Sequence, residues 1–198
     1  MELTYVAFGN NRRPPKVVPS TMQRATTMAR ISAKEAGGQN VVAFLDMLAA
    51  STHSTWVLDN SDDGYNVLEG SHGPIERENV YVAQRLLTFS TYDTFPPLDG
   101  VTVSEAGRYQ LSELDYWRYA ERLGLNDFRP LSQDRIAVAQ IRERSALALI
   151  QSGHIGTAIA ACANVWPHLS SKDFGNDPKR HAFLMSVYGN AGGTVAIG

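Results

Sequence analysis

The chain has 198 residues, of which 43% are hydrophobic and 19% are charged, which is enough apolar material for one folded domain with a small appendage. Its formal net charge of -2 excludes a strong sequence-independent attraction to nucleic acid or to an anionic membrane, so we expect no nucleic-acid partner. The single cysteine, Cys162, excludes an internal disulfide, and its apolar helical surroundings predict a buried thiol.

Residues 1–38 are predicted to form an N-terminal appendage. Residues 1–8 alternate as a short strand does, and residues 9–15 contain turn formers and paired prolines that exclude a helix. Ser20 is a suitable N-cap for a helix that runs to about Ala36, where Gly37 and Gly38 end it. The start of the chain lacks a basic lead and a cleavage site, so we expect no signal peptide and synthesis in the host cytoplasm. No apolar run reaches the roughly 18 residues that predict a membrane span.

Residues 39–198 are predicted to form the main domain. A helix begins near Gln39 and carries Val41, Phe44 and Leu48 on one apolar face before the polar stretch of residues 51–55. Between about residues 59 and 107, glycines and prolines exclude long helices and predict small hairpins and loops. Within this region, residues 65–70 are predicted to form a strand in which Tyr65 and Glu69 lie on the same face.

The remainder of the chain is predicted to be helical. Helices are expected over residues 111–123, 133–151 with Ser132 as the N-cap, 155–165 and 178–188. The order of one helix, a small β-region and then several helices shows no strand–helix alternation, so it excludes a parallel sheet. The sequence therefore predicts an α+β class in which helices dominate.

Several strings in this layout carry a family resemblance. They are AFLDMLA at residues 43–49, GYNV at residues 64–67 and AGRYQL at residues 106–111, followed by dense agreement from Leu123 to Val195. In order and content these strings resemble the endolysins of the bacteriophage lambda type, from about residue 41 to residue 195. The resemblance implies a lysozyme-like fold with a small β-hairpin region between the first helix and a helical lobe. Residues 1–38 and part of the loop between about residues 71 and 97 lie outside it.

The resemblance also implies a reaction. Lambda-type endolysins are similar to lytic transglycosylases, which cleave the β-1,4 bond between N-acetylmuramic acid and N-acetylglucosamine and form a 1,6-anhydro sugar. This chemistry needs one carboxyl group that is protonated near neutral pH, and no cofactor. The implied partner is the glycan strand of peptidoglycan, and the implied place of action is the cell wall, or a phage particle for a structural component.

Two positions depart from the family pattern. Alignment on residues 43–49 places the family's catalytic glutamate at Thr52, and the family's aspartate in the Gly-Tyr-Asp strand is Asn66 here. Glu69 and Glu105 are the catalytic candidates that could replace the lost acid, and a solvated carboxylate is the favoured alternative for each. His53 is a third donor, and a solvated histidine at a helix end is the alternative for it.

The resemblance makes the AGRYQL motif the floor of the cleft. Tyr109 and Gln110 are expected to bind sugar through an aromatic face and an amide. Arg108 is either a further binding residue or a structural ion-pairing residue. Tyr65 and Asn66 are also substrate-binding candidates. Trp117, Trp166 and Phe128 are expected in the core, and the scattered histidines predict no metal site.

Two functions follow for this chain. The first is a peptidoglycan-cleaving endolysin with a relocated proton donor. The second is a catalytically inactive, glycan-binding or phage structural protein, in which residues 1–38 dock to a phage or host protein. The first depends on the length of the resemblance, and the second depends on Thr52 and Asn66 together.

Overall fold

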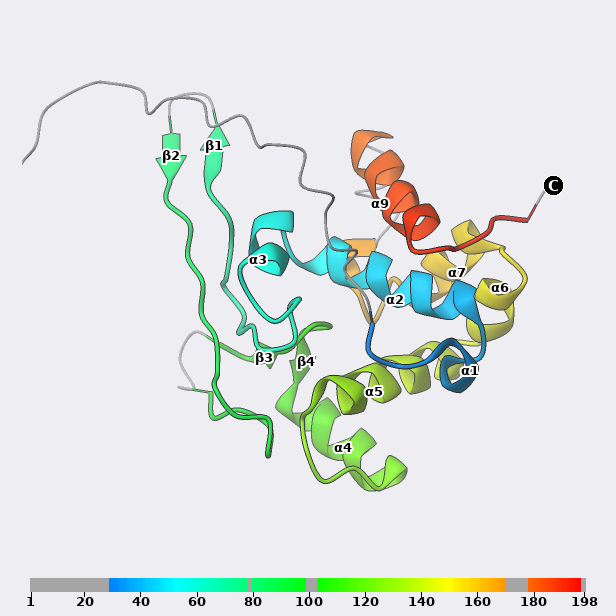
Figure 1. The fold of residues 1–198 in the computed structure, drawn as a ribbon, viewed down its shortest axis with the longest axis horizontal. Coiled ribbons are helices and arrows are strands. Elements are labelled where there is room, and N and C mark those ends of the chain that lie inside the picture. Colours follow the sequence, from blue (N-terminus) through cyan, green and yellow to red (C-terminus); the bar gives the residue numbers. More distant parts are fainter. Residues whose placement is uncertain (1–28, 78–79, 99–102, 170–177, 197–198) are drawn as a thin grey trace, which may run out of the picture.

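The structure is a computed structural model that describes residues 29–77, 80–98, 103–169 and 178–196. Figure 1 shows α2 (Gln39–Thr52) in the middle of the molecule, with α3 (Thr55–Asp59) at its left end on the side of a projecting β-hairpin and the other helices above, below and to the right of it. The predicted mixed class with dominant helices is confirmed, since the strands form two small antiparallel pairs. Among the described residues, no helix has the length and the apolar composition needed to cross a bilayer.

Helix α2 (Gln39–Thr52) begins where the sequence predicts it, but it is buried on nearly every side. All residues from Val41 to Ser51 are buried, as expected for a helix that other helices surround. Its main partners are α9 (Pro178–Asn190) and α6 (Leu147–Gln151), with α5 (Pro130–Glu143), α7 (Ile155–Cys162) and η1 (Pro167–Leu169) completing the core. Cys162 and Trp166 lie in this core, as predicted.

Residues 29–38 belong to the same folded unit, which corrects the predicted boundary at residue 38. Ala29 and Ile31 are buried in the core that surrounds α2, and so is Ala36 at the end of α1 (Ala33–Ala36). Gly37 adopts a φ of 104° and its carbonyl accepts a hydrogen bond from Gln151 Nε2 at 2.7 Å, so the glycine pair forms a packed corner between helices and not a hinge. The predicted strand over residues 1–8, the loop after it and the helix start at Ser20 lie outside the described residues.

The β-region contains less strand than the sequence predicts. Its helix is α3 (Thr55–Asp59), and its strands are β1 (Ile75–Arg77) paired with β2 (Val80–Val82), and β3 (Glu105–Ala106) paired with β4 (Leu111–Ser112). The strand expected over residues 65–70 is reduced to isolated bridges at Val67 and Leu68. The reason is that Gly64 and Gly70 turn the chain with positive φ at both ends of the segment.

The long helix predicted over residues 133–151 is two helices. Helix α5 begins at Pro130 and ends at Glu143, and Ser145 at a φ of 55° separates it from α6. Ser132 lies inside α5 and its hydroxyl donates to Asp127 Oδ1 at 2.6 Å, so it is not the N-cap. Helix α4 (Glu113–Leu123) ends at Gly124, as predicted.

A second, aromatic core lies under α4. The rings of Phe95, Tyr116 and Phe128 pack at centroid distances of 4.9 to 5.3 Å, which confirms Phe128 as a core residue. The ring of Trp117 lies 4.9 Å from that of Tyr116 but is 53% exposed, so the prediction of a core tryptophan was wrong there. The sequence separates these neighbours poorly, because both Tyr116 and Trp117 lie between apolar and charged residues.

Candidate functional site

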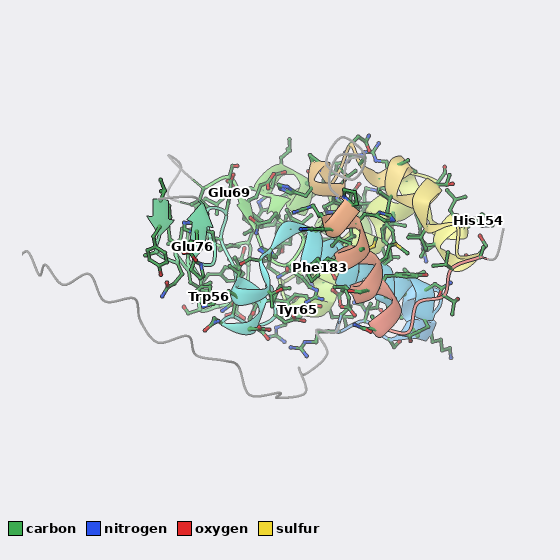
Figure 2. All side chains as sticks on the ribbon, turned by 90° about the horizontal axis from the view of Figure 1, so that it is seen from above. Trp56, Tyr65, Glu69, Glu76, His154 and Phe183 are labelled. Atoms are coloured by element: carbon green, nitrogen blue, oxygen red, sulfur yellow. The ribbon has the colours of Figure 1, made fainter. Side chains whose placement is uncertain are left out.

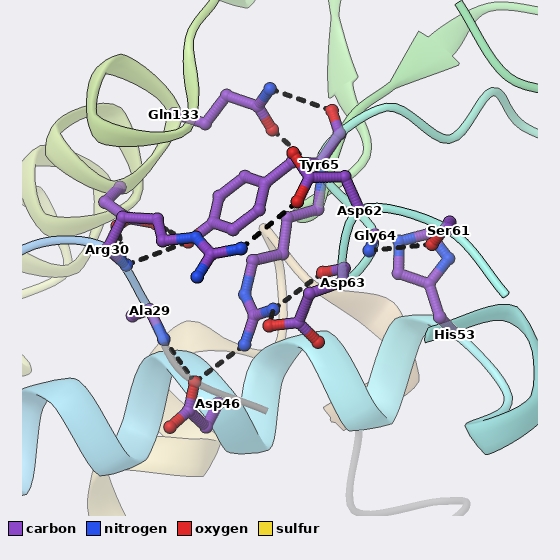
Figure 3. Close-up of polar contacts among 12 residues, drawn as sticks. Ala29, Arg30, Asp46, His53, Ser61, Asp62, Asp63, Gly64, Tyr65 and Gln133 are labelled. Atoms are coloured by element: carbon purple, nitrogen blue, oxygen red, sulfur yellow. Dashed lines mark hydrogen bonds and ion pairs between the residues drawn. The ribbon is translucent and has the colours of Figure 1, made fainter. Parts of the chain in front are cut away.

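A buried arginine organises the site. Arg108 is fully buried, and its Nη2 donates to Asp46 Oδ1 at 2.6 Å. Its Nη1 donates to the Asp63 carbonyl oxygen at 2.6 Å and also to the Asp63 carboxylate. The guanidinium also lies 5.0 Å from the centroid of the Tyr65 ring, within cation–π range. Figure 3 shows two of these partners, Asp46 on α2 and Asp63 in the turn that precedes Tyr65. A guanidinium in this position requires such partners, because an unpaired buried charge is very costly.

A second buried carboxylate, that of Asp134 on α5, ties the same region together. Its Oδ1 accepts hydrogen bonds from the hydroxyls of Tyr65 at 2.8 Å and Tyr109 at 2.7 Å. Its Oδ2 accepts from the backbone N–H groups of Arg30 at 2.7 Å and Ile31 at 2.8 Å. The chain before α1, α5 and the AGRYQL motif are therefore fixed to one another by one side chain.

These contacts correct the roles expected for Tyr65 and Tyr109 and decide between the two expected for Arg108. Arg108, Tyr109 and Tyr65 are at most 1% exposed, so their side chains are not accessible to a sugar in this structure. For Arg108, the structural ion-pairing alternative is the one that the contacts support. The tight turn at Gly107 directs the motif inward: at a φ of 82°, an added Cβ would lie 2.3 Å from Gln133 Oε1.

The position aligned with the family's glutamate lies at the C-terminal end of α2. Thr52 is partly buried, and its hydroxyl donates to the Leu48 carbonyl at 3.0 Å, one turn earlier. The next residue, His53, is buried with its Nε2 3.3 Å from the Gly107 carbonyl, which identifies Nε2 as the protonated ring nitrogen. Burial lowers the pKa of His53 to about 4, so the expectation of a solvated histidine was wrong.

Gln110 and Asn66 remain near this position and retain partial exposure. Gln110 Nε2 donates to the same Gly107 carbonyl at 2.8 Å. Asn66 Oδ1 accepts the backbone N–H of Asp62 at 2.9 Å and so closes the turn that holds Asp63. A sugar-binding role for both stays a prediction, since each side chain also has a structural partner.

The two replacement acids lie side by side on neighbouring segments. The backbone N–H of Glu69 donates to the Glu105 carbonyl at 3.0 Å. Glu69 Oε2 accepts from the backbone N–H and the hydroxyl of Ser104, at 2.7 and 2.8 Å, near the surface. Figure 2 shows Glu69 on the opposite side of the β-region from Tyr65. Glu105 is partly buried, and burial together with the Glu69 and Asp115 carboxylates raises its pKa.

Sequence reasoning missed the carboxylates that hold the site together. Asp46 and Asp134 lie on helices that pack in the core, and each is at most 1% exposed although it is acidic. The sequence gives one signal for each of them. Asp46 is an acidic residue within the apolar string AFLDMLA, and Asp134 lies in SQD, a string that carries the family resemblance. In the part of the chain that the structure describes, no group of three histidine, cysteine or acidic side chains is arranged to hold a metal ion.

Replacing Arg108 with methionine is expected to lower the free energy of unfolding by about 3–5 kcal/mol, because buried carboxylates lose their counterion. The control is Arg30→Met, which removes the ion pair with Asp62 between side chains that are 51% and 41% exposed. That exposed pair is expected to contribute less than about 1 kcal/mol. Urea unfolding measures both, and equal losses would contradict the assignment of Arg108 as the organising residue.

His53 is expected to make the protein less stable in acid. Because the folded pKa is about 4 and the ordinary value is 6.5, the unfolded chain takes up a proton first as the pH falls. Stability is therefore complete above pH 6.5 and is lost towards pH 4, by up to about 3 kcal/mol. We expect the difference in unfolding free energy between the native protein and His53→Gln to shrink over this range. A difference that stays constant with pH would show that His53 does not titrate this way.

Comparisons with known proteins agree with this architecture. A sequence model of the family described as Endolysin matches residues 42–195. The endolysin of Escherichia phage P2 is 36% identical over 159 residues, covering 80% of this chain and 96% of the relative. The endolysin of Escherichia phage lambda is 37% identical over 158 residues, covering 77% of this chain and 91% of the relative.

Solved structures give the same result. The lysozyme from bacteriophage lambda superposes with a TM-score of 0.62 at 35% identity, over 80% of this chain and 96% of that chain. A structure of bacteriophage lambda lysozyme complexed with a chitohexasaccharide gives a TM-score of 0.60 at 34% identity, over 85% of this chain and 100% of that chain. The predicted lysozyme-like fold is confirmed, and the chain belongs to the Endolysin family.

Proposed function

We propose that this protein is a peptidoglycan-directed member of the Endolysin family that binds glycan strands without cleaving them. Family membership and the chitohexasaccharide complex of lambda lysozyme support the glycan as its ligand. The proposed lack of cleavage depends on the identity and contacts of Thr52. Where the family resemblance places an acid, this chain has a hydroxyl that donates to the Leu48 carbonyl.

Proton donation at this position has no evident substitute among the nearest side chains. A threonine hydroxyl does not protonate a glycosidic oxygen near neutral pH, and loss of a general acid typically costs ~10²–10⁴ in rate. The neighbouring His53 is buried, and its lowered pKa of about 4 leaves it neutral, with its Nε2 proton directed to Gly107. The Glu69 carboxylate accepts from Ser104 and has no hydrogen bond to Tyr109 or Gln110 among the described contacts.

The test is digestion of purified Gram-negative peptidoglycan, with the soluble products read by mass spectrometry. We expect the native protein to co-sediment with the wall and to release no anhydro-muropeptides. Thr52→Glu is expected to release them, at least 100-fold above background, because it returns a carboxyl group to a partly buried position at the end of α2. Thr52→Gln matches the size of the new side chain without its proton and is expected to stay inactive. Release of product by the native protein would overturn the non-cleaving proposal.

A second candidate function, cleavage with a relocated acid, is favoured by one observation. Glu105 is partly buried, and its raised pKa, caused by burial and by the Glu69 and Asp115 carboxylates, keeps it protonated to higher pH than an ordinary glutamate. Two neighbouring carboxylates in different environments are the usual arrangement of a general acid beside an ionised partner.

For this second function, the native protein is expected to release anhydro-muropeptides at a rate that falls as the pH rises through the pKa of Glu105. Glu105→Gln is expected to lower that rate by at least 100-fold. Glu69→Gln, which removes a neighbouring negative charge, is expected to shift the pH profile to lower pH and to leave most of the rate. The reverse ranking of the two variants would make Glu69 the donor.

We also propose that the protein acts at the cell wall and that residues 1–28 contact a phage or host protein. The family match begins at residue 42, and the P2 relative is covered almost completely by 80% of this chain. The additional residues are therefore not accounted for by the family's common fold. Residues 29–38 no longer belong to this docking element, because they pack in the domain.

A further inference from the structure

Trp56 is a partly exposed aromatic residue four positions after Thr52, on α3. Two contacts fix its place. The Ser54 hydroxyl caps α3 by accepting from Val57 N at 3.3 Å, and it also accepts from Gly73 N at 3.2 Å. A Cβ added to Gly73 would lie 2.9 Å from the Trp56 Cβ, so the loop at Gly73 packs directly against the base of the tryptophan. The indole is therefore held beside the C-terminal end of α2 by two segments.

A second aromatic residue, on α9, lies on a helix that contacts the same end of α2. Arg180 Nη2, in the first turn of α9, donates to the Ser51 carbonyl at 2.9 Å. This contact places the start of α9 against the residue before Thr52. Phe183 lies three positions further along α9, so it is on the same side of that helix as Arg180, and it is 39% exposed. Figure 2 shows Trp56 on α3 and Phe183 on α9.

Stacking of a sugar on an aromatic side chain needs an accessible ring, and the motif tyrosine does not supply one. Tyr109 is 1% exposed and its hydroxyl is committed to Asp134. Trp56 has the properties that Tyr109 lacks: a partly exposed ring, a rigid base and a place next to Thr52. Trp117 is more exposed, but it lies on α4, which packs against β4 and α5 and not against the end of α2.

We propose that Trp56 is a stacking platform for a pyranose ring of the bound glycan strand, and that Phe183 contacts the same strand from α9. This inference rests on the proposed glycan-binding function and names residues for it. The face of a pyranose carries C–H groups, and a large aromatic ring buries them while the indole N–H remains able to donate to a hydroxyl or acetamido oxygen. The occupant is a β-1,4-linked N-acetylhexosamine strand, the chemical class of the chitohexasaccharide that lambda lysozyme holds.

The test uses the full-length protein and chitohexaose as the probe. The chain has three tryptophans, and Trp166 is buried while Trp117 is exposed on α4. Chitohexaose is expected to change the intrinsic fluorescence of the native protein and of Trp117→Phe, and to leave that of Trp56→Phe unchanged. By calorimetry, Trp56→Ala is expected to weaken chitohexaose binding at least tenfold, and Phe183→Ala at least threefold. Trp117→Ala is the matched control, and its affinity is expected to stay within twofold of the native value.

Co-sedimentation with purified peptidoglycan separates failure of the stacking role of Trp56 from failure of the glycan-binding function. If the native protein and Trp56→Ala sediment equally and bind chitohexaose with equal affinity, the stacking role is wrong and the glycan-binding function stands. If the native protein binds neither ligand, the proposed function fails and the inference fails with it. Circular dichroism and the urea midpoint of each variant identify any variant that does not fold. If Trp56→Ala does not fold, Trp56→Phe, which keeps an aromatic ring, tests the stacking role through its fluorescence.

Discussion

The burial of the Arg108 guanidinium is the constraint on which the rest of the structure depends. A buried cation is tolerated only when charged and polar partners replace its water shell. Asp46 on α2 and Asp63 in the turn before Tyr65 are those partners, and Asp134 on α5 closes a second set of bonds through the tyrosines. Segments far apart in the sequence are thereby required to meet at one point, which lies beside Asp46 in the middle of α2.

This arrangement separates the scaffold from the chemistry. Arg108 and Tyr109, which resemble the family's cleft motif, are committed to Asp46 and Asp134 and need no proton donor at Thr52 to keep their positions. The residue at position 52 can therefore differ without loss of the fold, because the Thr52 hydroxyl is satisfied by the Leu48 carbonyl. Function lies in the site and the fold survives its loss. The same logic explains why a match over four-fifths of the chain does not by itself establish cleavage.

Prediction from sequence succeeded where local pattern decides the structure. The start of α2 at Gln39, the end of α4 at Gly124 and the burial of Cys162 follow from periodicity, a left-handed glycine and apolar neighbours. It failed where distant segments decide. The burial of His53 depends on the Gly107 carbonyl, 54 positions away. The accessibility of a ring is likewise set by packing, which buries Tyr109 and leaves Trp117 exposed.

The net charge of the chain is consistent with recognition through neutral contacts. Peptidoglycan is polyanionic, and a chain with a formal charge of -2 gains little from long-range attraction to it. Thr52 and Asn66, where the resemblance implies acids, are uncharged, so the proposed site offers hydroxyl, amide and aromatic groups to a glycan. Hydrogen bonds and ring stacking against the uncharged faces of the sugars are the interactions that such a surface provides. In the proposed function, neutral residues at positions 52 and 66 therefore favour holding a glycan over cutting one.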